Sequence, residues 1–165
     1  MRRIVVMILV LTSTAASAAT NSGTVHVTGN LLSSSCTVTG GTDLTFNLDA
    51  VTKADFPDQS STAGRQEQSI ELICDADTVI NMTVDADTDA TDNTIIKNTG
   101  SAQGVGLQLL DVSNSNTPIK MGRRWVVITD STQVETIPLA AQYIRIGALE
   151  SGSVKANATY TLDYE

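Results

Sequence analysis

Apolar and polar residues alternate in short runs along this chain, and a period of two is typical of β-strands that bury one face. The first such run precedes the first cysteine and consists of Val25, Val27, Gly29 and Leu31. The last run ends at the C-terminus and consists of Ala158, Tyr160, Leu162 and Tyr164. A strand outside the first cysteine and a strand at the very end predict a domain whose two ends take part in assembly.

Residues 1–18 resemble a secretory signal peptide rather than part of a fold. Arg2 and Arg3 form a basic start, residues 4–11 are an apolar run too short to span a bilayer, and residues 16–18 give a small-x-small cleavage pattern. Removing 18 of the 165 residues would leave 147, the size of one ordinary domain. We therefore expect an exported protein, with no later apolar run of membrane length.

The charge of the expected mature chain is strongly negative. Without Arg2 and Arg3, eight Lys and Arg residues face eighteen Asp and Glu residues, a net charge near −10. Phosphate backbones and anionic surfaces attract basic proteins. Nucleic acid is therefore not an expected partner.

Further alternating runs fill the chain between its ends, and no helical period is visible. They occupy residues 44–48, 70–74, 80–84, 105–109, 125–128, 137–146 and 154–164. Polar, turn-rich connections separate them at residues 58–68, 85–104, 111–118, 130–135 and 147–153. Only residues 50–56 could hold one helical turn. Strands with regular turn signals predict an all-β, antiparallel β-sandwich without a second domain.

The two cysteines, Cys36 and Cys74, predict one structural disulfide, because exported proteins oxidise paired cysteines. The bond would close a loop of about 39 residues, which the chain-entropy account values at roughly 4 kcal/mol. A redox or thiolate metal site is disfavoured, since there is no C-x-x-C motif and no companion histidine.

No catalytic or metal constellation is evident, so we expect neither an enzyme nor a cofactor or metal. His26 is the single histidine and lies in the N-terminal run, away from any nucleophile. The acidic stretch 85–89 resembles the start of a calcium loop, but Ala90 and Ile96 replace the required Gly and Glu. The sequence GVG at residues 104–106 lacks the third glycine of a dinucleotide fingerprint.

The chain resembles the subunits of chaperone–usher pili, particularly the type 1 fimbrial group. The matching features are GTVHVTG before Cys36, IELIC ending at Cys74, GVGLQLLD, and the ending from IPLAAQYIRIG to ATYTLDYE. Like the family's C-terminal motif, the sequence has a penultimate Tyr164 and Gly152 fourteen residues from the end.

This resemblance implies an incomplete immunoglobulin-like sandwich that lacks its final strand. Residues 1–18 would be the signal peptide, residues 19–33 a donor-strand extension and residues 34–165 the pilin domain. The donor residues would be Val25, Val27, Gly29 and Leu31. The acceptor groove and chaperone-binding residues would be Gly152, Ala158, Tyr160, Leu162 and Tyr164.

The implied function is that of a structural fimbrial subunit that polymerises by donor-strand exchange and supports cell adhesion. Its partners would be a periplasmic chaperone, an outer-membrane usher and neighbouring subunits. The protein would be exported through the periplasm and assembled into a fimbrium on the cell surface. The alternative is a minor or adhesive, receptor-binding subunit.

Overall fold

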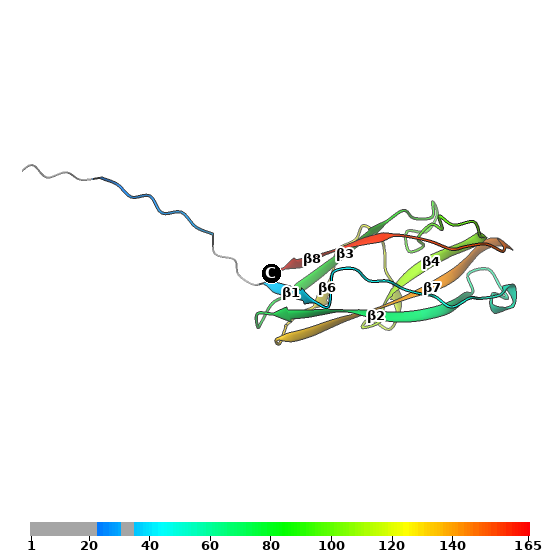
Figure 1. Cartoon of the computed structure of the whole chain (residues 1–165), viewed down its shortest axis with the longest axis horizontal. Coiled ribbons are helices and arrows are strands. Elements are labelled where there is room, and N and C mark those ends of the chain that lie inside the picture. Colours follow the sequence, from blue (N-terminus) through cyan, green and yellow to red (C-terminus); the bar gives the residue numbers. More distant parts are fainter. Residues whose placement is uncertain (1–22, 31–34) are drawn as a thin grey trace, which may run out of the picture. The chain divides into compact units, whose positions relative to one another are not determined.

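A computed structural model describes residues 23–30 and 35–165, which belong to two separate units of the chain. Residues 23–30 are exposed and have no regular secondary structure. Residues 35–165 form a β-sandwich (Figure 1). Across both described ranges, no helix has the length and apolarity needed to cross a membrane.

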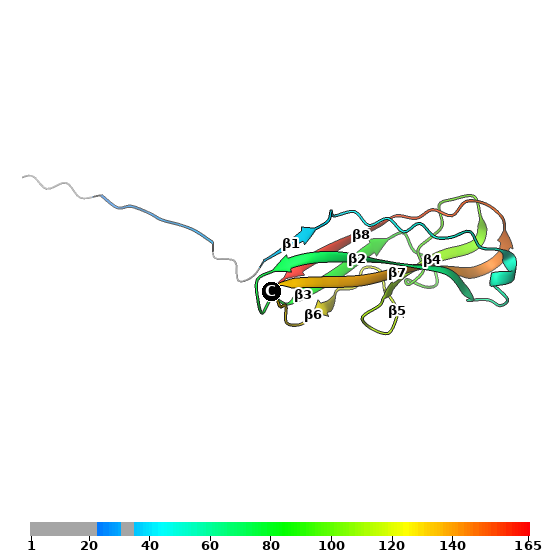
Figure 2. The same ribbon diagram turned by 60° about the horizontal axis from the view of Figure 1, so that its bottom comes forward.

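The sandwich consists of two antiparallel sheets, which can be followed in Figures 1 and 2. The five-stranded sheet contains, in spatial order, β1 (Cys36–Thr39), β2 (Thr62–Cys74), β7 (Val134–Glu150), β4 (Gln103–Asp111) and β5 (Thr117–Pro118). The three-stranded sheet contains β6 (Trp125–Ile128), β3 (Ile80–Ala86) and β8 (Ala158–Tyr164). One turn of 3-10 helix, Lys53–Asp55, lies within the segment expected to hold a helical turn.

The core lies between the sheets and is built from the inward residues of the alternating runs. Leu72 from β2 and Ile80, Met82 and Val84 from β3 are at most 1% exposed. They pack against further buried residues of β2 and β7, namely Ile70, Ile137 and Leu139. Because side chains point alternately to the two faces of a strand, the period of two in the sequence becomes one buried face here.

The predicted disulfide is confirmed between Cys36 and Cys74. The two residues are direct partners in the antiparallel register of β1 and β2. The bond therefore fastens the short first strand to the end of β2, where the domain begins.

The observed strands differ from the expected ones in several places. β2 begins at Thr62, inside the expected connection 58–68, because its polar first half pairs with the backbone of β7. β5 lies within the expected connection 111–118. Residues 44–48 are not a strand, and β8 begins at Ala158 rather than at residue 154.

Candidate binding groove

Two backbone edges that have no strand partner among the described residues border one opening of the sandwich. β8 pairs with β3 along one side, from Ala158 opposite Ala86 to Tyr164 opposite Ile80, and is the last strand of its sheet. Residues 40–51 form the other border and, within the described ranges, make no backbone–backbone hydrogen bond. Exposed N–H and C=O groups of this kind are a template for an added strand.

Residues 40–51 explain why the expected strand at 44–48 is absent. Leu44, Phe46 and Leu48 are half-buried and the residues between them are exposed, so the side chains alternate as expected. A β-ladder also requires a hydrogen-bonded neighbour, and this segment has none among the described residues. The segment therefore has strand-like side-chain alternation without a strand partner.

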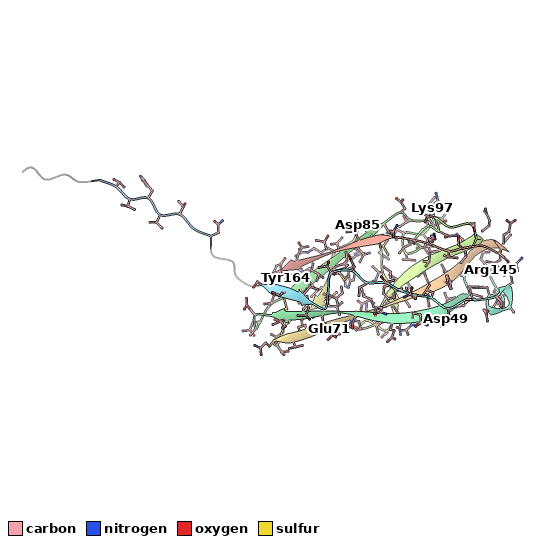
Figure 3. All side chains as sticks on the ribbon, viewed as in Figure 1. Asp49, Glu71, Asp85, Lys97, Arg145 and Tyr164 are labelled. Atoms are coloured by element: carbon pink, nitrogen blue, oxygen red, sulfur yellow. A yellow bond between two sulfur atoms is a disulfide. The ribbon has the colours of Figure 1, made fainter. Side chains whose placement is uncertain are left out.

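Between the two borders lies a groove with a volume of about 1230 Å³. Its floor is mostly apolar and comes from β3, β4 and β7, including Met82, Val84, Leu107, Leu109, Leu139 and Ala141. Its walls include Leu44, Phe46 and Leu48 on one side and the β8 residues Ala158, Tyr160, Leu162 and Tyr164 on the other. Figure 3 shows Tyr164 at the end of β8.

The β8 side chains do not contribute equally to the groove. Tyr160, Leu162 and Tyr164 are half-buried, whereas Ala158 is exposed. The Tyr160 hydroxyl donates a hydrogen bond of 2.6 Å to the Thr42 carbonyl oxygen, and so joins the two walls. Burial raises the pKa of the Tyr160 phenol, with a smaller contribution from the nearby Asp43 carboxylate. Burial likewise raises the pKa of Tyr164.

Gly152 is not among the residues that line the groove. It lies where residues 98–102 and 151–155 cross, and a Cβ at this position would come within 2.4 Å of the Ala102 nitrogen. Hydrogen bonds join the two segments, including Ala102 N–H to the Ser153 carbonyl at 3.0 Å. The position thus fixes the segment that leads into β8, and Val154 and Lys155 of that segment line the groove.

The C-terminal residue continues the β3–β8 pairing. The Glu165 and Val79 backbones exchange two hydrogen bonds of 2.9 Å each. Arg124 forms an ion pair with the Glu165 side chain and lies 3.6 Å from the Asp163 carboxylate. The hydrogen bond to Glu165 raises the pKa of Arg124, and these side chains remain on the surface. The backbone pairing of β8 therefore continues one residue beyond the strand, to Glu165.

The candidate donor residues lie in the exposed N-terminal unit. Val25 and Val27 are 86% and 89% exposed, which is unusual for large apolar side chains. A Cβ added to Gly29 would meet no described atom within 4 Å. Leu31, the fourth expected donor residue, lies outside the described residues.

The described residues contain no group of three or more His, Cys, Asp or Glu side chains placed to hold a metal ion. In the acidic stretch, the Asp89 carboxylate accepts hydrogen bonds from the Thr91 side chain and backbone, which lower its pKa. His26 is exposed.

The sequence did not predict one part of the groove, which is the wall formed by residues 40–51. Its signal was the alternation of Leu44, Phe46 and Leu48.

The fold and groove define a class of protein, a β-sandwich with an opening shaped for one further strand. The profile of the fimbrial protein family matches residues 25–165. The chain is 31% identical to the type-1 fimbrial protein A chain of Escherichia coli, over 98% of this chain and 96% of that protein. It is 30% identical to the major fimbrial subunit SMF-1 of Stenotrophomonas maltophilia, over 86% and 92% of the two chains.

Solved structures show the same fold. The P pilus rod subunit PapA superposes with a TM-score of 0.67 at 12% identity, over 79% of this chain and 99% of that chain. A type I fimbria protein of Burkholderia pseudomallei gives a TM-score of 0.58 at 28% identity, over 80% and 99%. The incomplete immunoglobulin-like sandwich expected from the sequence is therefore confirmed.

This chain belongs to the fimbrial protein family. It is a structural subunit of a fimbrium, exported to the cell surface. A fimbria adhesin of Klebsiella pneumoniae also matches, but at 25% identity and over only 46% of its length. The adhesive alternative is thus no better supported.

Proposed function

We propose that this subunit polymerises by donor-strand exchange, in which the N-terminal extension of one subunit completes the sandwich of the next. The observation that carries the proposal is the groove with a mostly apolar floor, which lies between two backbone edges that have no strand partner among the described residues. A strand placed there would pair with β8 and residues 40–51 and cover the floor. Addition of an extended segment to an open sheet edge is a common mode of protein recognition.

The donor would be residues 24–31, within an extension that spans residues 19–33 and precedes a pilin domain of residues 34–165. Val25, Val27, Gly29 and Leu31 share one face of an extended chain, so all four would enter the groove together. Burial of each large apolar side chain contributes roughly 1.5–3 kcal/mol. Backbone hydrogen bonds add about 1 kcal/mol each. The gross gain is on the order of 10 kcal/mol per junction, from which ordering the extension subtracts.

Before assembly the groove needs a temporary occupant, because an open apolar edge promotes aggregation. We assign this role to a periplasmic chaperone that supplies a strand to the same groove, with contacts along Ala158, Tyr160, Leu162 and Tyr164. An outer-membrane usher would then exchange that strand for the extension of the next subunit. Residues 1–18 would direct export and be removed. The role requires no catalysis by this subunit.

The test compares two substitutions on opposite faces of the extension. Gly29→Leu places a large side chain on the inward face, where overpacking costs roughly 1–3 kcal/mol. His26→Ala changes the outward face. We expect Gly29→Leu to stop fibre formation while the domain stays folded, and His26→Ala to assemble nearly as well as wild type. Fibre yield and the urea midpoint of the monomer are the two measurements. Normal assembly of Gly29→Leu would refute the assignment of this segment as the donor.

A further inference from the structure

An apolar pair lies on the outer face of the five-stranded sheet, outside the groove. Ile73 and Val134 are direct partners in the β2–β7 register and are 49% and 68% exposed. The next outward pair along these strands, Glu71 and Thr136, is polar and exposed. Antiparallel sheets usually place polar residues on a face that meets water. Adjacent exposed apolar side chains on such a face are typical of a contact surface.

The N-terminal extension leaves the sandwich at the same end of the sheet. Cys36 is bonded to Cys74, which follows Ile73 in β2. Ser35 donates from its backbone N–H and its hydroxyl to the Asp75 carboxylate, at 3.1 and 3.0 Å, and its carbonyl oxygen accepts from the Asp75 N–H at 3.0 Å. The disulfide and these hydrogen bonds fix the exit of the extension beside the apolar pair.

Buried hydrogen bonds hold this exit in place from the inside of the domain. The Asp75 carbonyl oxygen accepts from the hydroxyls of Thr78 and Ser131, at 2.7 and 2.6 Å. Both of these residues are at most 2% exposed, and the Thr78 N–H donates to the Ser131 hydroxyl at 3.0 Å. Satisfied buried networks are rigid. The exit of the extension and the apolar pair therefore belong to one stiff part of the domain.

The chain between this exit and the proposed donor segment is short. Only three residues, at positions 32–34, separate Ser35 from Leu31, the last proposed donor residue. Four residue steps span at most about 14 Å. β1, β2 and β7 are adjacent strands, and neighbouring strands lie about 5 Å apart, so Val134 is about 10 Å from β1. A copy that accepts Leu31 must therefore lie close to the apolar pair.

We propose that Ile73 and Val134 dock on the copy that accepts this chain's extension, as a second contact between successive subunits. The inference rests on the proposed strand exchange and adds to it a surface outside the groove. Burial of the pair would slow the separation of two joined subunits, because interface contacts act mainly on the dissociation rate.

The first experiment replaces Ile73 and Val134 together by threonine in the full chain. Threonine keeps the β-branched shape that suits a strand, so the urea midpoint of the monomer should stay close to that of wild type. Fibres of the double variant should dissociate about tenfold faster in denaturant than wild-type fibres. Val126→Thr is the matched control, because Val126 is 48% exposed but lies on β6 in the other sheet. Its fibres should dissociate at the wild-type rate.

A synthetic peptide of residues 23–33 separates this inference from the strand exchange itself. The peptide can fill the groove but carries no second domain, so wild type and both variants should bind it equally. If all three bind the peptide and fibres of the double variant last as long as those of Val126→Thr, the inference is overturned and the proposed function stands. If the wild-type subunit does not bind the peptide, strand exchange fails and the inference fails with it.

A photo-crosslinking amino acid in place of Val134 identifies the occupant of the surface. In two-subunit oligomers separated by size exclusion, we expect a crosslink between the two copies, and only background from the same probe in place of Val126. Equal crosslinking from both positions, a crosslink that forms only in longer fibres, or capture of the chaperone alone would each overturn the inference.

Discussion

Replacement of Gly152 by alanine tests how the segment before β8 is held. The added Cβ would lie 2.4 Å from the Ala102 nitrogen and 2.6 Å from the Ser101 carbonyl carbon, both of them backbone atoms. The two segments must therefore separate, at a cost of roughly 1–3 kcal/mol. Separation also weakens the exposed Ser101–Ser153 hydrogen bonds, worth about 0.5–1.5 kcal/mol each. Alanine also lowers the conformational entropy of the unfolded chain relative to glycine, which stabilises the folded chain by about 0.4–1 kcal/mol. We expect a net loss of about 2 kcal/mol.

The assay is urea unfolding of the mature chain, with the free energy of unfolding taken by linear extrapolation. Gly147→Ala, near the end of β7, is the matched control. The nearest atom to its added Cβ is the Gly104 Cα, at an ordinary contact distance of 3.6 Å. We expect Gly147→Ala to change the stability by less than about 0.5 kcal/mol. If Gly152→Ala is as stable as Gly147→Ala, the reasoning from this backbone crossing is wrong.

Three further predictions follow from the sandwich and its open edge. The oxidised mature chain should show no free thiol after denaturation, and replacing both Cys36 and Cys74 by serine should cost about 4 kcal/mol on unfolding. The folded chain should form phenolate at higher pH than the denatured chain, because burial raises the pKa of all three tyrosines above 10.0; the stability that the neutral phenols contribute should therefore be constant well below pH 10 and be lost as the pH rises through the folded values. Deletion of residues 161–165 removes the β8 residues paired with Ile80 to Thr83, so the subunit should no longer co-purify with a chaperone; an intact complex would argue against the role of β8.

The sequence predicted the elements whose stability depends on one buried face. β3, β4, β6 and β7 lie where apolar residues alternate, since each strand contributes inward side chains to the core. The disulfide followed from the cysteine count and from the export that the sequence predicts. The polar first half of β2 had no such pattern, because its pairing with β7 depends on backbone hydrogen bonds. Side-chain periodicity carries no information on that pairing.

The groove was predicted in part. Its β8 wall follows from the C-terminal alternation and from the resemblance to pilus subunits. The opposite wall was mistaken for a strand, because alternation reports a half-buried face but not whether a neighbour completes the ladder. The contact between Tyr160 and Thr42 and the packing of Gly152 depend on residues more than 40 positions apart. A single sequence does not show which of its distant residues lie close together in the folded chain.

The central claim is that this chain is a repeating subunit of a surface fibre built by strand exchange. The most direct measurement is electron microscopy of producing cells labelled with a gold-conjugated antibody against residues 35–165. We expect label at regular intervals along the fibre shaft in wild-type cells, and loss of labelled fibres in cells that produce the Gly29→Leu chain. Surface fibres without label, or undiminished labelled fibres from Gly29→Leu, would contradict the account.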